Sequence, residues 1–198
     1  MKTKKSFISI IVIVVVILLA CSYGIKNYNA MAAKEEGVKT AWSQVQNQYQ
    51  RRADLIPNLV NTVKGYAAHE QETLQAVIEA RAKATQVNTT PTGATPEQMQ
   101  QYMQAQDGLS QALGKLMVVV ERYPELKANE NFKMLQVQLE GTENRIAVER
   151  NRFNEEAKGF NTFIRLFPRN IVAAITGFKA RPYFEATAAA QEAPTVEF

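Results

Sequence analysis

Glu149 and Glu156 come closest to the spacing of a metal site. They lie one heptad apart on a stripe predicted to face the inside of a helical bundle, and di-iron bundles build their sites from inward glutamates. Such sites also need a Glu-x-x-His motif on each of two further helices. This sequence has a single histidine, His69, and the neighbouring Glu70 and Glu72 do not reproduce that motif. We therefore predict no metal site and no cofactor.

Covalent catalysis has equally little support in the sequence. The only cysteine, Cys21, lies in an apolar run, and a lone cysteine forms no internal disulfide. No serine stands in the Gly-x-Ser-x-Gly turn of a hydrolase, and no glycine-rich loop of the phosphate-binding type occurs. We predict that the protein is not an enzyme.

The charged residues near the predicted inward stripes favour a structural role instead. Our hypothesis is a polar network in which arginines reach carboxylates across the bundle and neutralise them. Its candidate members are Arg51, Arg52, Arg145, Arg150, Glu35, Glu143, Glu149 and Glu156. A buried ion pair is weak evidence for stability but can fix the register of helices. The alternative is that these residues lie at the edges of the bundle with their charged ends in water.

The N-terminal residues 1–25 have the composition of a membrane anchor. From Ser6 to Ile25 there are twenty residues without a charge, and about twenty helical residues cross a bilayer core. Three lysines precede this run, whereas the basic residues that follow it are partly offset by glutamates. Since positive charge is enriched on the cytoplasmic side of a membrane, we expect a single-pass chain whose bundle lies on the extracytoplasmic side.

The same residues allow a second kind of tether. A positive N-terminus, an apolar run and then Leu18-Leu19-Ala20-Cys21 resemble a bacterial lipobox. In that case the run is cleaved and Cys21 carries lipid. The apolar run continues past Cys21 to Ile25, which favours the uncleaved transmembrane helix. Both alternatives tether the bundle to a membrane.

Beyond residue 25 the composition favours helices. Ala, Gln, Glu, Lys and Arg dominate, with seven prolines and nine glycines in 198 residues. Four segments repeat apolar residues in alternating steps of three and four, the period of helices packed side by side. Three of them span 26–53, 57–84 and 96–122, and the fourth follows a break at 124–129. We predict an all-α fold, an N-terminal anchor helix followed by an antiparallel bundle of long helices in up-down-up-down order.

The first connection of this bundle depends on Pro57. Proline suits the first turn of a helix, and Asp54 upstream can satisfy free amides, so the sequence favours a hairpin at this point. The alternative is that Pro57 only kinks one continuous helix. A later boundary is clearer, because Thr95-Pro96-Glu97 has the pattern of a cap followed by proline at the first helical position.

The net charge of +4 does not indicate nucleic-acid binding. Three lysines flank the anchor, and residues 26–198 contain 20 basic and 19 acidic side chains. Because no stripe of Lys and Arg with interleaved aromatic residues remains, we expect no nucleic-acid partner.

A second membrane contact is predicted after the fourth helix. Aromatic and aliphatic residues alternate there with arginine and lysine, a composition that binds at membrane interfaces. The candidate interfacial residues are Phe163, Phe167, Arg169, Ile171 and Phe178. The alternative, which we favour slightly, is that this segment folds back over the open end of the bundle. Residues 26–184 thus form the predicted bundle, and residues 185–198, which lack a core-forming pattern, a flexible tail.

Three segments of the sequence carry a resemblance to a known family. They are Ala41-Trp42-Ser43-Gln44-Val45, the run from Arg51 to Tyr66, and Leu139 to Ile146 with Arg150 and Phe153-Asn154. These residues resemble the bacterial LemA family. With the anchor, the similarity covers roughly residues 7–180. The resemblance implies a membrane-tethered antiparallel helical bundle in a bacterium, related to proteins of magnetosome membranes. It implies no particular biochemical activity.

These features together predict a non-enzymatic scaffold or interaction module, tethered to the cell membrane of a bacterium. It would act by self-association or by organising the membrane. The alternative is an accessory or sensor subunit of a membrane protease or another envelope complex. The expected partners are membrane lipid, through the anchor, and either further copies of the chain or an envelope protein.

Overall fold

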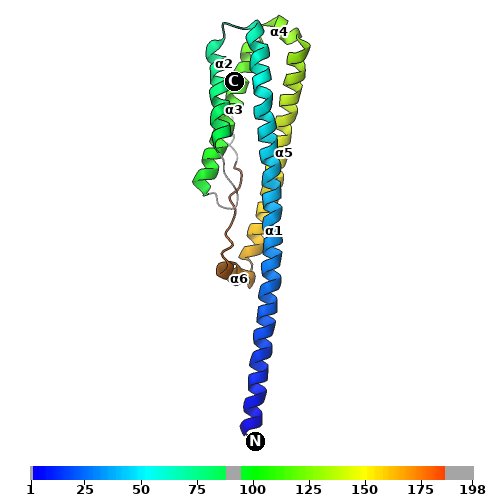
Figure 1. The fold of residues 1–198 in the computed structure, drawn as a ribbon, viewed down its shortest axis with the longest axis vertical. Coiled ribbons are helices and arrows are strands. Elements are labelled where there is room, and N and C mark those ends of the chain that lie inside the picture. Colours follow the sequence, from blue (N-terminus) through cyan, green and yellow to red (C-terminus); the bar gives the residue numbers. More distant parts are fainter. Residues whose placement is uncertain (1, 88–94, 186–198) are drawn as a thin grey trace, which may run out of the picture. The chain divides into compact units, whose positions relative to one another are not determined.

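A computed structural model describes residues 2–87 and 95–185, and their side chains from Ile10 onward. Every regular element in these residues is a helix, which confirms the all-α prediction (Figure 1). The elements are α1 (Lys2–Tyr66), α2 (Gln71–Gln86), α3 (Pro96–Val120), α4 (Pro124–Ala128), α5 (Glu130–Arg165) and α6 (Arg169–Thr176). They form two compact units. Of the described residues, unit 1 comprises 2–38 and 156–181, and unit 2 comprises 39–87, 95–155 and 182–185.

The predicted hairpin at Pro57 is wrong, because α1 continues through this proline to Tyr66. Proline has no N–H to donate to the carbonyl four residues earlier, which makes it costly inside a helix. Here the carbonyl of Ala53 accepts instead from Nε of Arg81 on α2, at 2.7 Å. Ile56 and Leu59, on either side of Pro57, are both fully buried. The packing of α2 thus compensates for the missing helical hydrogen bond.

The first reversal of the chain lies at residues 67–70 instead. The N–H of Glu70 donates to the carbonyl of Ala67 at 3.1 Å. The carboxylate of Glu70 accepts from the Arg122 guanidinium and the Tyr123 hydroxyl, both at 2.9 Å. Because Arg122 and Tyr123 directly follow α3, these bonds place the start of α2 beside the end of α3.

The remaining contacts of unit 2 show helices that alternate in direction. Nε2 of Gln106 on α3 donates to the carbonyl of Ala84, near the end of α2, at 3.0 Å. Nδ2 of Asn129, just before α5, donates to the hydroxyl of Tyr66 at the end of α1, at 2.9 Å. These contacts place the end of α2 beside α3 and the start of α5 beside the end of α1, and the first reversal lies about ten residues later than predicted (Figure 1).

The predicted start of the third helix is confirmed. The Thr95 hydroxyl accepts from the N–H of Gln98 at 3.2 Å, and the Gln98 side chain accepts from the N–H of Thr95 at 2.9 Å. This reciprocal pair is a capping box, followed by Pro96 at the first helical position. The predicted break at 124–129 contains the short helix α4. The predicted tail lies outside the described residues from 186 onward.

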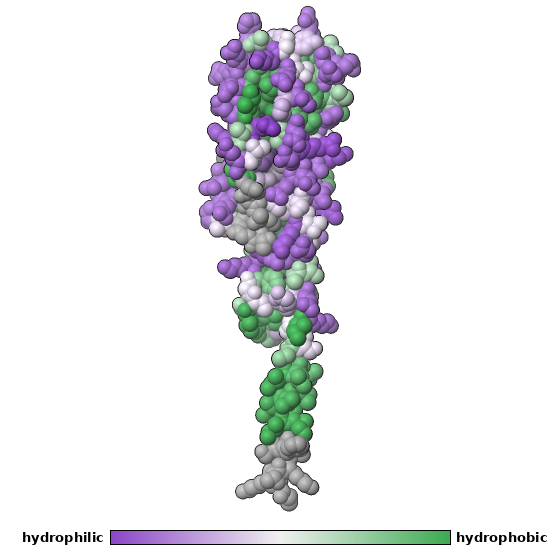
Figure 2. All heavy atoms as spheres, viewed as in Figure 1, coloured by the Kyte–Doolittle hydropathy of each residue, from purple (hydrophilic) through white to green (hydrophobic). Residues whose placement is uncertain are grey.

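The N-terminal part of α1 has the properties of a membrane-spanning helix. Among the described residues, α1 is the one helix long and apolar enough to cross a membrane. Its side chains from Ile10 to Leu19 are 47% to 65% exposed, and Figure 2 shows them as a continuous apolar surface. A buried core helix would hide such residues, so their exposure agrees with the predicted anchor.

The Pro57 compensation gives a first prediction. Arg81→Met leaves the Ala53 carbonyl without its donor, and an unsatisfied buried group costs about 1–3 kcal/mol. In a Pro57→Ala background the same change should cost clearly less, because residue 57 then supplies its own N–H. The measurement is the thermal unfolding of all four chains in mild detergent, followed by circular dichroism. Equal losses in both backgrounds would contradict this role for Arg81.

Candidate functional site

A buried arginine is the centre of the polar interior of unit 2. The side chain of Arg52 on α1 is 1% exposed. Its Nη1 donates to the Ser110 hydroxyl at 2.7 Å and to the Glu143 carboxylate at 2.6 Å. Its Nη2 donates to both oxygens of Gln106, the side-chain amide at 2.8 Å and the backbone carbonyl at 3.1 Å. One guanidinium thus joins α1 to α3 and α5.

The two charged partners of the Arg52 cluster differ in their exposure to water. The Glu143 side chain is 42% exposed, so the negative partner is partly hydrated while the positive one is not. The Tyr49 ring, one turn earlier on α1, lies 5.2 Å from the guanidinium and adds a cation–π contact. The charge of Arg52 is therefore compensated by one carboxylate, three neutral acceptors and an aromatic face.

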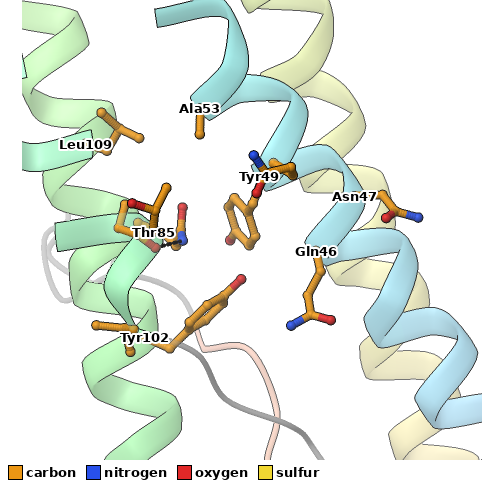
Figure 3. Close-up of a pocket in the computed structure, with 11 residues that line it drawn as sticks. Gln46, Asn47, Tyr49, Ala53, Thr85, Tyr102 and Leu109 are labelled. Atoms are coloured by element: carbon orange, nitrogen blue, oxygen red, sulfur yellow. Dashed lines mark hydrogen bonds between the residues drawn. The ribbon is translucent and has the colours of Figure 1, made fainter. Parts of the chain in front are cut away.

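A pocket of about 350 Å³ opens beside this cluster, between α1, α2 and α3 (Figure 3). The residues that line it are Gln46, Asn47, Tyr49, Gln50, Ala53, Ala84, Thr85, Val87, Tyr102, Gln106 and Leu109. Only the two tyrosines among them are ionisable. Burial raises the pKa of both hydroxyls, so each stays protonated at neutral pH. The described residues that line the pocket offer hydrogen-bond donors and acceptors from amide and hydroxyl groups.

Asp107 and Arg150 form a second polar contact of unit 2, at 3.9 Å between carboxylate and guanidinium. The Arg150 guanidinium also lies 4.8 Å from the Phe184 ring. Burial raises the pKa of the Asp107 carboxyl, although the charges of Arg150 and Arg52 act in the opposite direction. Burial therefore disfavours the charged form of Asp107, and the attraction of the neighbouring arginines offsets this effect only in part.

The structure brings together only some of the predicted network. Arg52 pairs with Glu143, whereas Arg150 lies near Asp107, which the sequence reasoning missed because Asp107 is off the apolar stripe of its helix. Among the described residues, Oε2 of Glu149 is buried without a hydrogen-bond partner. Arg51, Arg145 and Glu156 are exposed, and Glu35 in unit 1 pairs with Arg181.

The predicted interfacial residues lie in unit 1. The Phe163 ring lies 4.1 Å from the Arg169 guanidinium and 5.4 Å from Nζ of Lys34 on α1. Phe178 packs on Tyr28 of α1, with ring centroids 5.6 Å apart. Phe167 and Ile171 are exposed. Part of this segment thus folds against α1, and part faces outward.

Cys21 is free and exposed on α1. Within the described residues, no group of three or more His, Cys, Asp or Glu side chains is placed to hold a metal ion. The lone His69 is exposed near the α1–α2 turn.

Comparison with known proteins gives the family of this chain. The model of the LemA family matches residues 41–198. The chain belongs to the LemA family. It is 30% identical over 175 residues to the magnetosome protein MamQ 2 of Paramagnetospirillum magneticum, covering 80% of this chain and 64% of that protein. The chain spans about 64% of the length of the MamQ proteins it matches.

Two further relatives fit the same assignment. The magnetosome protein MamQ of Magnetospirillum gryphiswaldense is 30% identical over 174 residues, covering 79% of this chain and 64% of the relative. The protein LemA of Metamycoplasma hominis is 24% identical over 145 residues, covering 73% and 63%.

The segments that carry the LemA resemblance supply both sides of the buried cluster. The run from Arg51 to Tyr66 contains Arg52, and the run from Leu139 to Ile146 contains Glu143. Asn154, in the last of the resembling positions, binds both backbone groups of Phe184, at 2.9 Å and 2.8 Å. In this LemA protein the resembling residues therefore build the interior of unit 2.

The Arg52 cluster gives a second prediction. Glu143→Gln removes the carboxylate that accepts from the buried Arg52 guanidinium, and a hydrogen bond to a charged group contributes about 1.5–3 kcal/mol. The same change in an Arg52→Met chain should cost much less. Glu130→Gln is the matched control, because its pair with Lys133 is exposed and such pairs contribute little. Equal unfolding temperatures for Glu143→Gln and Glu130→Gln would contradict the assignment.

Asp107 gives a third prediction. The pKa of the Asp107 carboxyl is raised in the folded chain, so the folded chain binds the carboxyl proton more tightly than the unfolded chain does. The free energy of unfolding therefore falls as the pH rises from the unfolded-state pKa, about 4, through the folded-state pKa. Asp107→Asn should therefore unfold at a higher temperature than the parent at pH 7. The gain should shrink as the pH is lowered and vanish below pH of about 4. Thermal unfolding of both chains across this range tests the prediction, and a less stable variant at pH 7 would contradict it.

Proposed function

We propose that this LemA protein is a membrane-tethered, non-enzymatic interaction module of the bacterial envelope. Its bundle would serve as a scaffold, through self-association or by organising the membrane to which it is tethered. The bundle would lie on the extracytoplasmic side, as the lysines before the anchor favour.

The observation that carries this proposal is the character of α1. Its N-terminal side chains are apolar and exposed, whereas Val45, Arg52 and Ile56 further along the same helix are buried in unit 2. A helix segment that is apolar on all sides suits a lipid environment, and an amphipathic segment suits the surface of a protein core. The N-terminal part of α1 is of the first kind, and the part that packs in unit 2 is of the second. One element would therefore be both the tether and a member of the bundle.

The interior of unit 2 supports binding over catalysis. The donors on both terminal nitrogens of Arg52 are engaged by protein groups. The pocket beside it is lined by amides, hydroxyls and apolar side chains. These groups have the chemistry of a structural core with a small polar opening.

A groove between α3 and α5 favours a second candidate, an accessory or sensor subunit of a membrane protease or other envelope complex. The groove has a volume of about 500 Å³ and is lined by Leu113, Met117 and Leu139 among other residues. Val118, next to it in the sequence, is 72% exposed. Exposed apolar side chains beside a groove are typical of a protein-binding surface.

Purification of the full chain in mild detergent separates the two candidates and is our fourth prediction. The scaffold proposal expects complexes whose mass, measured by native mass spectrometry, is a multiple of this 22.2 kDa chain without a foreign subunit. A foreign chain at fixed stoichiometry would favour the accessory role. A monomer without partners would contradict both.

The mode of tethering has its own measurement. The mass of the mature chain tells whether residues 1–20 are present. An intact N-terminus supports the transmembrane helix, and a lipid-modified Cys21 as first residue supports the lipoprotein alternative. An unmodified chain that begins beyond the apolar run and stays in the soluble fraction would contradict the tether itself.

A further inference from the structure

We propose that unit 1 makes a second contact with the bilayer, through a ridge formed by Phe167, Ile171 and Ile175. This inference rests on the proposed membrane tether and adds a lipid-binding surface to it. The occupant of the ridge would be the headgroup and upper acyl region of the same membrane that α1 enters.

The ridge is the outward face of an amphipathic element. Ala173 of α6 is buried and Val172 is partly buried. Ile171 and Ile175 lie four residues apart on the same helix face and are 51% and 80% exposed. Phe167, just before α6, is 80% exposed. The folded chain therefore presents three large apolar side chains outward, next to an inner face that is already packed.

Contacts inside unit 1 fix this segment at one level of α1. Nε of Arg169, at the start of α6, donates to Oδ1 of Asn27 at 3.2 Å. Phe178, just after α6, packs on the Tyr28 ring at 5.6 Å. Asn27 is itself buried, with its Nδ2 bonded to the Tyr23 carbonyl at 2.8 Å. Both ends of α6 are thus attached to residues 27–28.

These contacts lie where a bilayer surface is expected. Asn27 and Tyr28 follow the end of the uncharged stretch, Ile25, by two and three residues, which is about 3–4.5 Å along a helix. The headgroup zone on each side of the hydrocarbon core is about 5–7 Å thick. If the stretch from Ser6 to Ile25 fills the core, α6 is attached to α1 at the level of the headgroups.

The surroundings of the ridge favour lipid over a second protein. Ile25 and Tyr28 on α1 are 63% and 46% exposed, so the apolar surface of α1 continues toward α6, as Figure 2 shows for this unit. Lys26, Arg165 and Lys179 are exposed nearby in the sequence. Apolar side chains bordered by basic ones bind interfacially, most strongly to anionic lipid.

Membrane binding as such would not test this idea, because the tether alone retains the chain on lipid. The depth of single labelled residues in the bilayer does test it. The full chain is synthesised without cells in the presence of phosphatidylcholine–phosphatidylglycerol vesicles, so that no processing removes the anchor. An environment-sensitive fluorophore is attached to one cysteine at a time, and quenching by lipids with a nitroxide near the headgroup is recorded.

Three labelled chains make the comparison. The parent chain carries the label on Cys21 and reports the anchor. Ile175→Cys in a Cys21→Ser background reports the ridge. Val118→Cys in the same background is the matched control, since Val118 is 72% exposed in unit 2. Both Val118 and Ile175 are exposed enough that a label displaces no packed side chain, and Ile171→Cys gives a second reading of the ridge.

The expected result is quenching at residues 175 and 171 several times that at residue 118 and comparable to that at Cys21. Quenching at Cys21 with none at 175 and 171 would overturn the ridge contact and leave the tether intact. No quenching at Cys21 would overturn the tether and with it this proposal. The label at residue 175 could also be shielded from water but not quenched, and become exposed when the protein is diluted in lipid. This result would assign the ridge to contact with a second copy of the chain, and it would also overturn the proposed lipid contact.

Discussion

The hydrogen bonds of the buried Arg52 guanidinium are the interaction that links the helices of unit 2. This guanidinium is buried on α1, yet its acceptors come from α3 and α5, and Gln106 in turn bonds the end of α2. A buried charge tolerates few other arrangements, because a shift of one helix by a turn would leave it unpaired. Apolar stripes alone allow several registers. We propose that the polar cluster selects among them.

The neighbouring residue carries the second constraint. Ala53 lies directly after Arg52, and its carbonyl would have no helical donor because of Pro57 four residues on. Arg81 supplies that donor from α2. The carbonyl that lacks a hydrogen bond within α1 thus forms one between α1 and α2. Consecutive residues of α1 therefore fix α2, α3 and α5. This also explains how a proline can lie inside a long helix, next to the fully buried Ile56.

The features that could be predicted from sequence are those with local causes. The anchor follows from twenty uncharged residues, the start of α3 from Thr95 and Pro96, and the packed faces from apolar residues at helical spacing. The effect of Pro57 could not be read in this way, because it is decided by Arg81, which is 28 residues from Ala53. Likewise the contact of Arg150 with Asp107 joins α5 to α3, and no local pattern distinguishes Asp107 from other polar residues of its helix.

The distribution of polar and apolar groups indicates where the protein can act. In unit 2 the charges of Arg52 and Glu143 are engaged with each other, and burial keeps Tyr49 and Tyr102 protonated. Groups arranged in this way hold helices together. In unit 1 the opposite holds, since Phe167 and Ile175 are exposed although Phe160 and Ala173 close by are buried. Exposed aromatic and aliphatic side chains on a packed segment are the observation from which the lipid contact of unit 1 is proposed.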